Sequence, residues 1–442
     1  MMIDLTPYYA RPGEQPFGAR RMAMPWRNHV PLPPDAIQPR WRALLQSQLP
    51  AAKRLLYLHI PFCATHCKFC GFYQNKLRDD STATYIRYLL QELALEANSP
   101  LHQSAPIHAV YFGGGTPTAL AASELAAIIR AIRTSLPLAP DCEITVEGRI
   151  LNFDDERIDA CLDAGANRFS IGIQTFDSRI RQRLGRRSDK QQAVSFLERL
   201  GRRDKAAVVC DLMFGLPQQT EQSWREDLAI VGDLPLDGVD LYALNLLPST
   251  PLAQAVENQR VELPDLAARR NFYRIGAATL AGEGWRQLSN SHWAKTTRER
   301  NLYNLLIKQG ADCLALGCGA GGNLNGQAYM MERNLERYYQ MLDAGQKPIA
   351  MMTPAGGGAA WQHQLQAGIE VGRVRLPALT RRAGELQPLL SQWHQAGLVC
   401  DDSTCLRLTD DGRFWANNLL QALQQIIPQL NSDELTHDRS PV

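Results

Sequence analysis

Six apolar runs of strand length alternate with helical patterns between residues 54 and about 250, and this alternation constrains the fold more than any other feature. Amphipathic segments such as TATYIRYLLQELALEAN and ASELAAIIRAIRTSL lie between the runs. Repeated strand–helix–strand units form right-handed crossovers and a parallel sheet. The pattern predicts an α/β fold with a partial or full (β/α) barrel, whose functional residues lie at the carboxyl ends of the strands. The expected strands are 55–60, 107–112, 143–147, 168–174, 206–215 and 238–247.

The chain of 442 residues is long enough for a large barrel with additional parts. We expect an N-terminal extension over 1–50, a barrel core with additional elements over 51–345, and a mostly helical C-terminal domain over 359–430. Residues 350–358 (AMMTPAGGG) resemble a linker. Near the C-terminus, GLVCDDSTCLRLTDDGRFWANNLL predicts strand, turn, strand and helix, which is a winged-helix-like pattern. It has no basic recognition helix, so we expect it to pack against the core rather than bind DNA.

Charge and composition narrow the range of partners. A net charge of +2, with 21% charged residues, gives no indication of nucleic acid or an anionic membrane as a partner. The sequence has no apolar run long enough to span a bilayer and no signal-peptide layout at its start. We therefore expect a cytoplasmic protein. Ten cysteines in such a chain do not suggest disulfides, and seven of them are scattered like small buried apolar residues.

The remaining three cysteines, Cys63, Cys67 and Cys70, fall within eight residues directly after the first predicted strand, in YLHIPFCATHCKFCGFYQN. Their polar neighbours and Gly71 indicate a loop rather than a core segment. Structural zinc sites usually have four ligands in paired C-x-x-C units, and no second pair is present; His66 lies awkwardly between two of the cysteines. Three thiolates with one ligand missing suit a [4Fe–4S] cluster with one iron open to a small molecule.

The C-x3-C-x2-C spacing resembles that of the radical S-adenosylmethionine (SAM) enzymes. Phe69 before the last cysteine and the position after a strand strengthen the resemblance. It implies that the three cysteines bind a [4Fe–4S] cluster, that the cluster donates an electron to cleave SAM to a radical, and that Phe69 lies near SAM. The protein would orient and shield this chemistry.

A glycine-rich loop follows the second predicted strand in YFGGGTPT, residues 111–118. Glycines let a ligand approach the backbone closely, and backbone N–H groups bind carboxylate or phosphate. The loop resembles the radical SAM motif that holds the methionine amine and carboxylate of SAM, which implicates Gly114, Gly115 and Thr116.

The string GGGTPT more narrowly resembles the oxygen-independent coproporphyrinogen III oxidase group, and this resemblance extends over most of the chain. In that group matching positions bind SAM, and two SAM molecules occupy the site. The roles are chemically reasonable, since carboxylates accept hydrogen bonds from hydroxyls and amines and arginine pairs with carboxylates. Tyr57 and His59 are also candidate catalytic residues. The implied SAM-site residues are Tyr57, His59, Glu147, Gln174, Arg186, Asp211, Asn245 and Gly322.

Three segments depart from the oxidase pattern. VEGRILNF lacks the Asp/Asn-Pro pair expected after its glutamate, NLYNLLIKQG (301–310) replaces N-F-Q-G-Y-T, and GCGAGGNLNG (317–326) is richer in glycine. These segments surround the expected second SAM and tetrapyrrole, so they suggest a changed substrate or a changed use of SAM. The heme chaperones of the superfamily carry H-N-x-x-Y-W where this chain reads RNLYNL, which weakens that alternative too.

The N-terminal extension (DLTPYYARPG, RRMAMPWRN, PLP) and the altered central segment resemble the anaerobic heme-utilisation branch, the anaerobilin synthases. This resemblance implies a radical SAM methyltransferase acting on heme. A SAM-derived carbon radical would add at a meso carbon, and ring opening would give a methylated linear tetrapyrrole and free iron. Reduced flavodoxin or a similar donor would supply electrons. An oxygen-independent coproporphyrinogen III oxidase and a non-catalytic heme chaperone remain the alternatives.

Heme requires a large apolar slot with a few polar or ligand residues. His292 in SNSHWAK is the first candidate, and a candidate catalytic residue, because it matches a histidine of the oxidase. Further candidates for heme contact are Trp293, His29 and Met330. The arginines expected near the propionates, or equally on a solvated basic face, are Arg20, Arg21 and Arg27.

Overall fold

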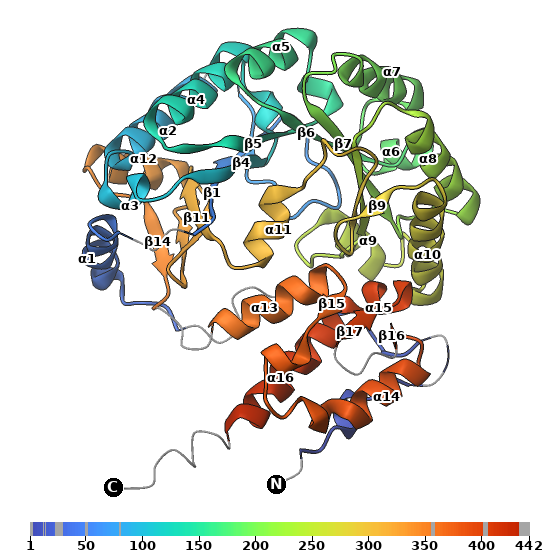
Figure 1. Ribbon diagram of the computed structural model, residues 1–442. Coiled ribbons are helices and arrows are strands. Elements are labelled where there is room, and N and C mark those ends of the chain that lie inside the picture. The colour runs from blue at the N-terminus through green and yellow to red at the C-terminus, as the bar shows by residue number, and fades with distance from the viewer. Residues whose placement is uncertain are drawn as a thin grey trace, which may run out of the picture.

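The computed structural model describes residues 3–11, 13, 15–22, 30–48, 52–78, 81–354, 359–400 and 405–432. Within these ranges twelve strands form one sheet, in the order β14-β13-β12-β11-β1-β4-β5-β6-β7-β8-β10-β9. The sheet curves around a central helix, with most other helices on its outer side (Figure 1). The six strands expected from the sequence are β1 (Arg54–Ile60), β4 (Ile107–Gly114), β5 (Leu138–Gly148), β6 (Arg168–Gln174), β7 (Ala207–Phe214) and β8 (Gly238–Ala243).

The parallel part of the sheet runs from β11 (Asp312–Leu316) through β1 and β4 to β8, with each neighbouring pair parallel. The predicted α/β fold is therefore confirmed. Among the described strands, the sheet does not close on itself: β14 and β9 are its two edge strands. The sheet is therefore a partial barrel. All six parallel strands expected from the sequence are present. Their carboxyl ends meet at one edge of the sheet, where the glycine loop and the polar strand ends lie.

Helices between the strands form the outer layer, and several begin at a side chain that caps the first turn. Asp154, Asp177, Asp189, Thr220 and Asp265 each accept a hydrogen bond from a backbone N–H two or three residues further on. The helices of this layer are α2 (Ser81–Glu96), α3 (Pro100–Gln103), α4 (Ala122–Ser135), α5 (Asp155–Ala164), α6 (Ser178–Arg183), α7 (Lys190–Gly201), α8 (Glu221–Asp233), α9 (Pro251–Glu257) and α10 (Leu266–Gly282). The central helix is α11 (Leu302–Lys308).

Antiparallel strands that the sequence did not predict extend the sheet at both edges. They are β9 (Arg286–Gln287), β10 (His292–Ala294), β12 (Gly321–Leu324), β13 (Gln327–Met331) and β14 (Ile349–Met352), with α12 (Leu335–Asp343) before the last. Residues 350–352 lie in β14, so the expectation of a linker there was wrong, and the sheet continues past residue 345. Residues 355–358 lie outside the described ranges.

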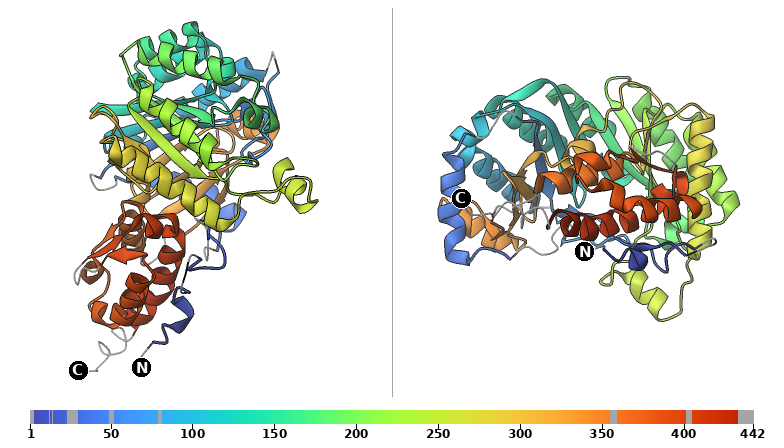
Figure 2. Two further views of the ribbon diagram at one scale, coloured as in Figure 1. Left: turned by 90° about the vertical axis from the view of Figure 1, so that its right-hand side faces the viewer. Right: turned by 60° about the horizontal axis from the view of Figure 1, so that its bottom comes forward.

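The C-terminal elements form a separate group below the barrel, beside the N-terminal segment (Figure 2). The predicted order of strand, turn, strand and helix is present as β16, β17, α15 and α16, although residues 401–404 are outside the described ranges. The elements are α13 (Ala359–Glu370), β15 (Arg373–Val374), α14 (Gln387–Gln395), β16 (Val399–Cys400), β17 (Leu406–Leu408), α15 (Asp410–Phe414) and α16 (Ala416–Ser432).

The N-terminal extension contacts both parts of the molecule. Helix α1 (Pro34–Leu45) packs on the sheet edge, where the rings of Trp41 and Tyr329 lie 4.9 Å apart. The segment before it runs along the C-terminal elements: Trp393 Nε1 donates to Tyr8 O at 3.1 Å and Arg20 Nε donates to Phe414 O at 2.8 Å. The extension thus ties the C-terminal group to the barrel.

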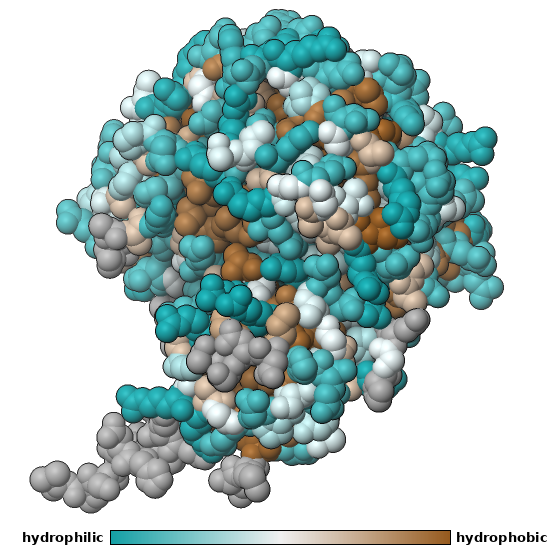
Figure 3. Space-filling model, turned by 45° about the vertical axis from the view of Figure 1, so that its right-hand side comes forward, coloured by the Kyte–Doolittle hydropathy of each residue, from teal (hydrophilic) through white to brown (hydrophobic). Residues whose placement is uncertain are grey.

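The visible surface is mixed in polarity. On the face that Figure 3 shows, hydrophilic side chains predominate, and apolar residues are visible among them in several places, including near the junction with the lower part. In the part of the chain that the structure describes, no helix has both the length and the apolar character needed to cross a membrane.

Candidate active site

The three clustered cysteines line one cavity of about 170 Å³. Cys63 ends the short strand β2 (Phe62–Cys63), which pairs with β3 (Asn75–Lys76), and the intervening loop carries the other two. Cys63 and Cys67 are buried, whereas Cys70 is partly exposed. Thr116 Oγ1 donates to Cys63 Sγ at 3.4 Å. The loop is therefore closed at its base by β-pairing and held against the glycine loop.

The same cavity collects side chains from the carboxyl ends of four neighbouring strands, β4 to β7. Because parallel strands end at one edge, residues far apart in the sequence meet there. The structure brings ten of the predicted site residues to this cavity. They are Cys63, Cys67, Phe69, Cys70, Gly115, Thr116, Glu147, Gln174, Arg186 and Asp211.

The glycine loop passes so close to the cysteine loop that side chains would collide. A Cβ on Gly115 would lie 2.6 Å from Phe62 O, and Gly115 N donates to Ile60 O at 2.8 Å. Gly114 has a φ of +107° and packs against the ring of His59, where a Cβ would lie 2.6 Å from the ring. Glycine is thus required at both positions, and Gly114 supports the cavity without lining it.

Tyr57 and His59 lie on β1, beside the cavity but not among its lining residues. Tyr57 Oη is 3.0 Å from His59 Nδ1, and the rings of Tyr111 and Tyr303 lie 4.6 Å apart nearby. Burial, and then the charge of Arg333, lower the pKa of His59 to about 4, so its ring is neutral at neutral pH. Its Nε2 is buried without a hydrogen-bond partner.

Two carboxyl groups face the cavity in a poorly solvated position. Burial raises the pKa of Glu147 to about 7, although Tyr111 Oη opposes the shift by donating to Glu147 Oε1 at 2.7 Å. Burial, and then the charges of Asp240 and Glu147, also raise the pKa of Asp211, whose Oδ1 accepts a hydrogen bond from Ser170 at 3.0 Å. An amine or hydroxyl of a ligand would be a favourable partner for either carboxyl.

Two arginines bring positive charge to the same cavity. Arg186 Nη1 donates to Gly172 O at 2.9 Å, and the sequence had predicted this residue. Arg149 was not predicted as a site residue, yet it lines the cavity and binds Thr65 within the cysteine loop. The sequence did contain a signal for Arg149: it lies two residues after Glu147, in the segment that departs from the oxidase pattern.

His292 does not line this cavity. Its side chain is fully buried on β10, with Nδ1 3.0 Å from Asp240 Oδ2 and Nε2 3.2 Å from Glu299 Oε1. Burial opposes its protonation, but the charges of these two carboxylates outweigh burial and raise the pKa of His292 to about 9. Arg168 completes the network through Glu299, with Nε and Oε2 2.9 Å apart. The ring of His292 is therefore paired with a carboxylate at each of its nitrogens, away from the cavity.

The other candidates also lie apart from the cavity. Asn245 is exposed after β8, and Gly322 lies on β12, where a Cβ would lie 2.3 Å from the ring of Tyr329. Trp293 is buried in the main core and Met330 lies on β13. Arg20 and Arg21 bind the C-terminal helices through Phe414 O and Gln421 Oε1. The remaining two candidates, Arg27 and His29, lie outside the described residues.

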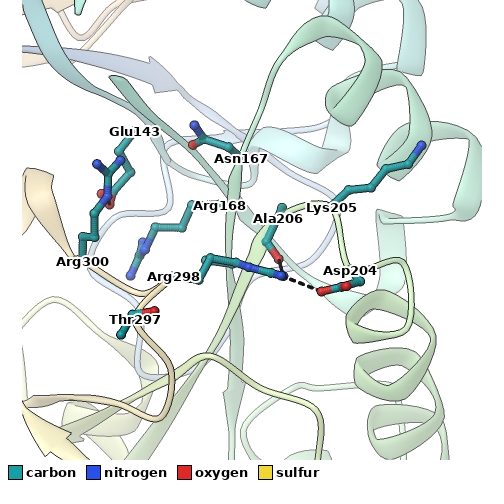
Figure 4. Close-up of a pocket in the computed structure, with 10 residues that line it drawn as sticks. Glu143, Asn167, Arg168, Asp204, Lys205, Ala206, Thr297, Arg298 and Arg300 are labelled. Carbon is teal, nitrogen blue, oxygen red and sulfur yellow. Dashed lines mark hydrogen bonds and ion pairs between the residues drawn. The ribbon is translucent and has the colours of Figure 1, made fainter. Parts of the chain in front are cut away.

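A second cavity, of about 410 Å³, lies at the amino-terminal ends of β6 and β7, opposite the cysteines. Arginines, a lysine and two carboxylates line it, and Arg298 reaches Asp204 within it (Figure 4). Arg298 Nη2 is 2.6 Å from Asp204 Oδ1, and Arg300 Nη1 is 3.0 Å from Asp141 Oδ2. This end of a barrel commonly serves stability rather than chemistry.

The residues around the first cavity fit an iron–sulfur cluster with SAM beside it. The described residues contain no group of three His, Cys, Asp or Glu side chains placed to bind a single metal ion. The three cysteines lie around a common cavity instead. Arg149 Nε, Arg186 Nε and Gln174 Oε1 are buried there without hydrogen-bond partners. Three thiols suit the cluster, and the unpartnered polar atoms suit a polar ligand.

Comparison with known proteins identifies the family. Residues 57–231 match the Radical SAM superfamily. Over 438 residues the chain is 58% identical to the anaerobilin synthase of Escherichia coli O157:H7, an alignment that covers 99% of this chain and 98% of that protein. The chain belongs to the anaerobilin synthase family. As a member of the Radical SAM superfamily, it uses a [4Fe–4S] cluster and SAM.

Proteins outside the anaerobilin synthase family are also similar. The oxygen-independent coproporphyrinogen III oxidase of Bradyrhizobium diazoefficiens is 29% identical over 405 residues, covering 85% of this chain and 88% of that protein. The solved structure of coproporphyrinogen III oxidase (HemN) from Escherichia coli has a TM-score of 0.74 at 23% identity, covering 87% of this chain and 93% of that chain. At that identity the structural likeness shows the shared fold.

Proposed function

We propose that this chain is an anaerobic radical SAM methyltransferase that opens the porphyrin ring of heme, giving a methylated linear tetrapyrrole and free iron. The observation that carries the proposal is the 58% identity to an anaerobilin synthase over nearly the whole length of both proteins. The cavity supports it, because the cysteines, the glycine loop and the polar strand ends are assembled in one place.

The chain's own residues have distinct tasks in this proposal. Cys63, Cys67 and Cys70 hold the cluster, which when bound supplies the electron that cleaves SAM to a reactive radical. The backbone at Gly115 and Thr116 lies next to the cluster loop and suits the methionine carboxylate of SAM.

Three charged side chains of the cavity would also contact SAM. Glu147 and Asp211 would accept hydrogen bonds from its amine and ribose hydroxyls, and Arg186 would pair with the same methionine carboxylate. The β-pairing of β2 with β3 closes the cysteine loop, and the packing of Gly115 on Phe62 holds the glycine loop beside it. We further propose that a reduced flavodoxin, or a similar donor, delivers the electrons.

Anaerobic incubation of the cluster-loaded protein with reduced flavodoxin, SAM and heme tests the proposal. The Soret absorbance should disappear and chelatable ferrous iron should appear in proportion. Cys67→Ala, which lacks one cluster ligand, should leave heme intact. Complete cleavage of SAM with unchanged heme would contradict the proposal, and carbon dioxide release from coproporphyrinogen III would favour the oxidase activity instead.

A further inference from the structure

Two chain segments beside the three cysteines carry positive charge and no acidic residue. Between Pro61 and Asn75, Lys68 is the single Lys, Arg, Asp or Glu, and between Ser178 and Ser188 the chain has five arginines and no acid. Arg181 and Arg186 of this second segment are buried, whereas Arg179, Arg183 and Arg187 are exposed. Two positively charged segments therefore flank the proposed cluster ligands.

Backbone contacts join these two segments into one surface. Lys68 N donates to Leu184 O at 3.1 Å, and a Cβ on Gly185 would lie 3.2 Å from His66 O. Lys68 O in turn accepts from Leu252 N at 2.9 Å, which fixes the loop from the other side. Lys68 thus lies directly beside the turn that carries Arg183 and Arg187.

Little negative charge is available to neutralise this surface from its own elements. Asp177 and Asp189, the acids on either side of the arginine segment, are used as helix caps. Asp177 Oδ1 accepts from Arg179 N at 2.8 Å, and Asp189 Oδ1 accepts from Gln192 N at 2.9 Å. The exposed cations remain directed to solvent, and a partner with an acidic face would be attracted to them.

An exposed aromatic side chain lies in the same loop as Lys68. Phe72 is 65% exposed, although large apolar side chains are normally buried. Its backbone N–H donates to Cys70 Sγ at 3.4 Å, and Cys70 is the one cluster cysteine that is partly exposed. An apolar centre within a charged rim is the usual composition of a protein–protein contact. Here that contact would cover the most accessible ligand of the cluster.

We propose that Lys68, Phe72, Arg183 and Arg187, which we call the basic collar, form the docking surface for an acidic one-electron donor protein that reduces the cluster by way of Cys70. The inference rests on the proposed function, because cleavage of SAM requires an electron from outside the chain. One electron passes from the reduced flavin of the donor to the oxidised cluster. The donor is oxidised by one electron, and no bond or proton is exchanged with the chain.

Stopped-flow reduction of the cluster, followed by its visible absorbance, tests the collar. Reduced flavodoxin is the protein donor, and reduced methyl viologen, a small cation, is the donor that needs no docking. In Lys68→Glu/Arg183→Glu/Arg187→Glu the rate with flavodoxin should fall about tenfold or more at low salt, since steering by charge accelerates association by about 10–10³-fold. The rate with methyl viologen should stay at least at the wild-type value.

Two further variants and a binding measurement make the outcome decisive. Arg183→Glu/Arg187→Glu leaves the cysteine loop unchanged and should still lose most of the reduction rate with flavodoxin. Phe72→Ala should weaken the binding of flavodoxin to the cluster-free protein. The control Arg130→Glu/Lys205→Glu/Arg286→Glu reverses three exposed cations elsewhere and should behave like wild type.

An unchanged flavodoxin rate in the collar variants, or an equal loss with methyl viologen, would overturn the proposal. Failure of the proposed function would look different. Wild-type protein would then accept electrons from flavodoxin at the normal rate, and the collar variants would lose that rate, while heme would stay intact in every case.

Discussion

Arg149 holds Thr65, which lies between Cys63 and Cys67, through both terminal nitrogens of its guanidinium group. Nη1 donates to Thr65 O at 3.1 Å and Nη2 donates to Thr65 Oγ1 at 3.0 Å. Arg149 N also donates to Thr118 Oγ1 at 3.3 Å, which joins the end of β5 to the glycine loop. One residue therefore connects three parts of the site. Burial raises the pKa of the Cys63 thiol, and the hydrogen bond from Thr116 and then the charge of Arg149 oppose that shift.

Arg149→Ala should loosen the cysteine loop, because two hydrogen bonds from a charged donor are lost, each contributing about 1.5–3 kcal/mol. We expect SAM cleavage with a chemical reductant to slow by about tenfold or more and cluster occupancy to fall. Arg149→Lys should recover only part of this, since an ammonium group does not reproduce a two-point contact. Arg130→Ala, at an exposed position on α4, is the control. Wild-type SAM cleavage in Arg149→Ala would show that the contact is dispensable.

Each of Cys63→Ala, Cys67→Ala and Cys70→Ala should abolish cluster binding and SAM cleavage, because an iron without its thiolate is open to exchange. Iron and sulfide content and the visible spectrum of the reconstituted proteins measure the loss. Cys400→Ala is the matched control, since Cys400 is exposed and remote from the cavity. Normal cluster content in any of the three variants would exclude that residue as a ligand.

The stability of the cluster-free protein should depend on pH through Glu147. Its pKa is raised from 4.5 to about 7, so the unfolded state ionises first and stability falls as pH increases between these values. One pKa unit corresponds to ~1.4 kcal/mol, so ionisation of Glu147 should lower the free energy of unfolding by up to about 3 kcal/mol across this range. Glu147→Gln should not show this decrease. Urea unfolding of both proteins between these pH values measures the difference. A constant difference across the range would contradict the assignment.

His292→Ala should destabilise the fold by about 3–5 kcal/mol, because it leaves a buried carboxylate without its partner. The contribution of His292 is fully present below its ordinary pKa of 6.5 and is lost as pH rises through about 9, since its folded-state pKa is the higher one. Urea unfolding of the cluster-free protein provides the measurement, with the exposed His394→Ala as control. Wild-type stability combined with lost heme binding would instead show that His292 contacts the substrate.

The parallel strands and the cavity were predictable because each depends on local patterns. Apolar runs set β1 and β4 to β8, and the parallel arrangement itself places Glu147 and Asp211 near the cysteines. Other features of the structure depend on contacts that no local pattern reveals. His292 is paired by Asp240 and Glu299, which come from other elements, and Gly322 is required by Tyr329 on the next strand. Arg149 was overlooked because its partner, Thr65, lies 84 residues earlier.

The identity of the product tests the central claim most directly. The protein is incubated anaerobically with heme, a reduced electron donor and SAM labelled in its methyl group, and the product is analysed by mass spectrometry. The account predicts an iron-free linear tetrapyrrole that carries one labelled carbon from SAM. An intact porphyrin, or a linear product without the label, would contradict it.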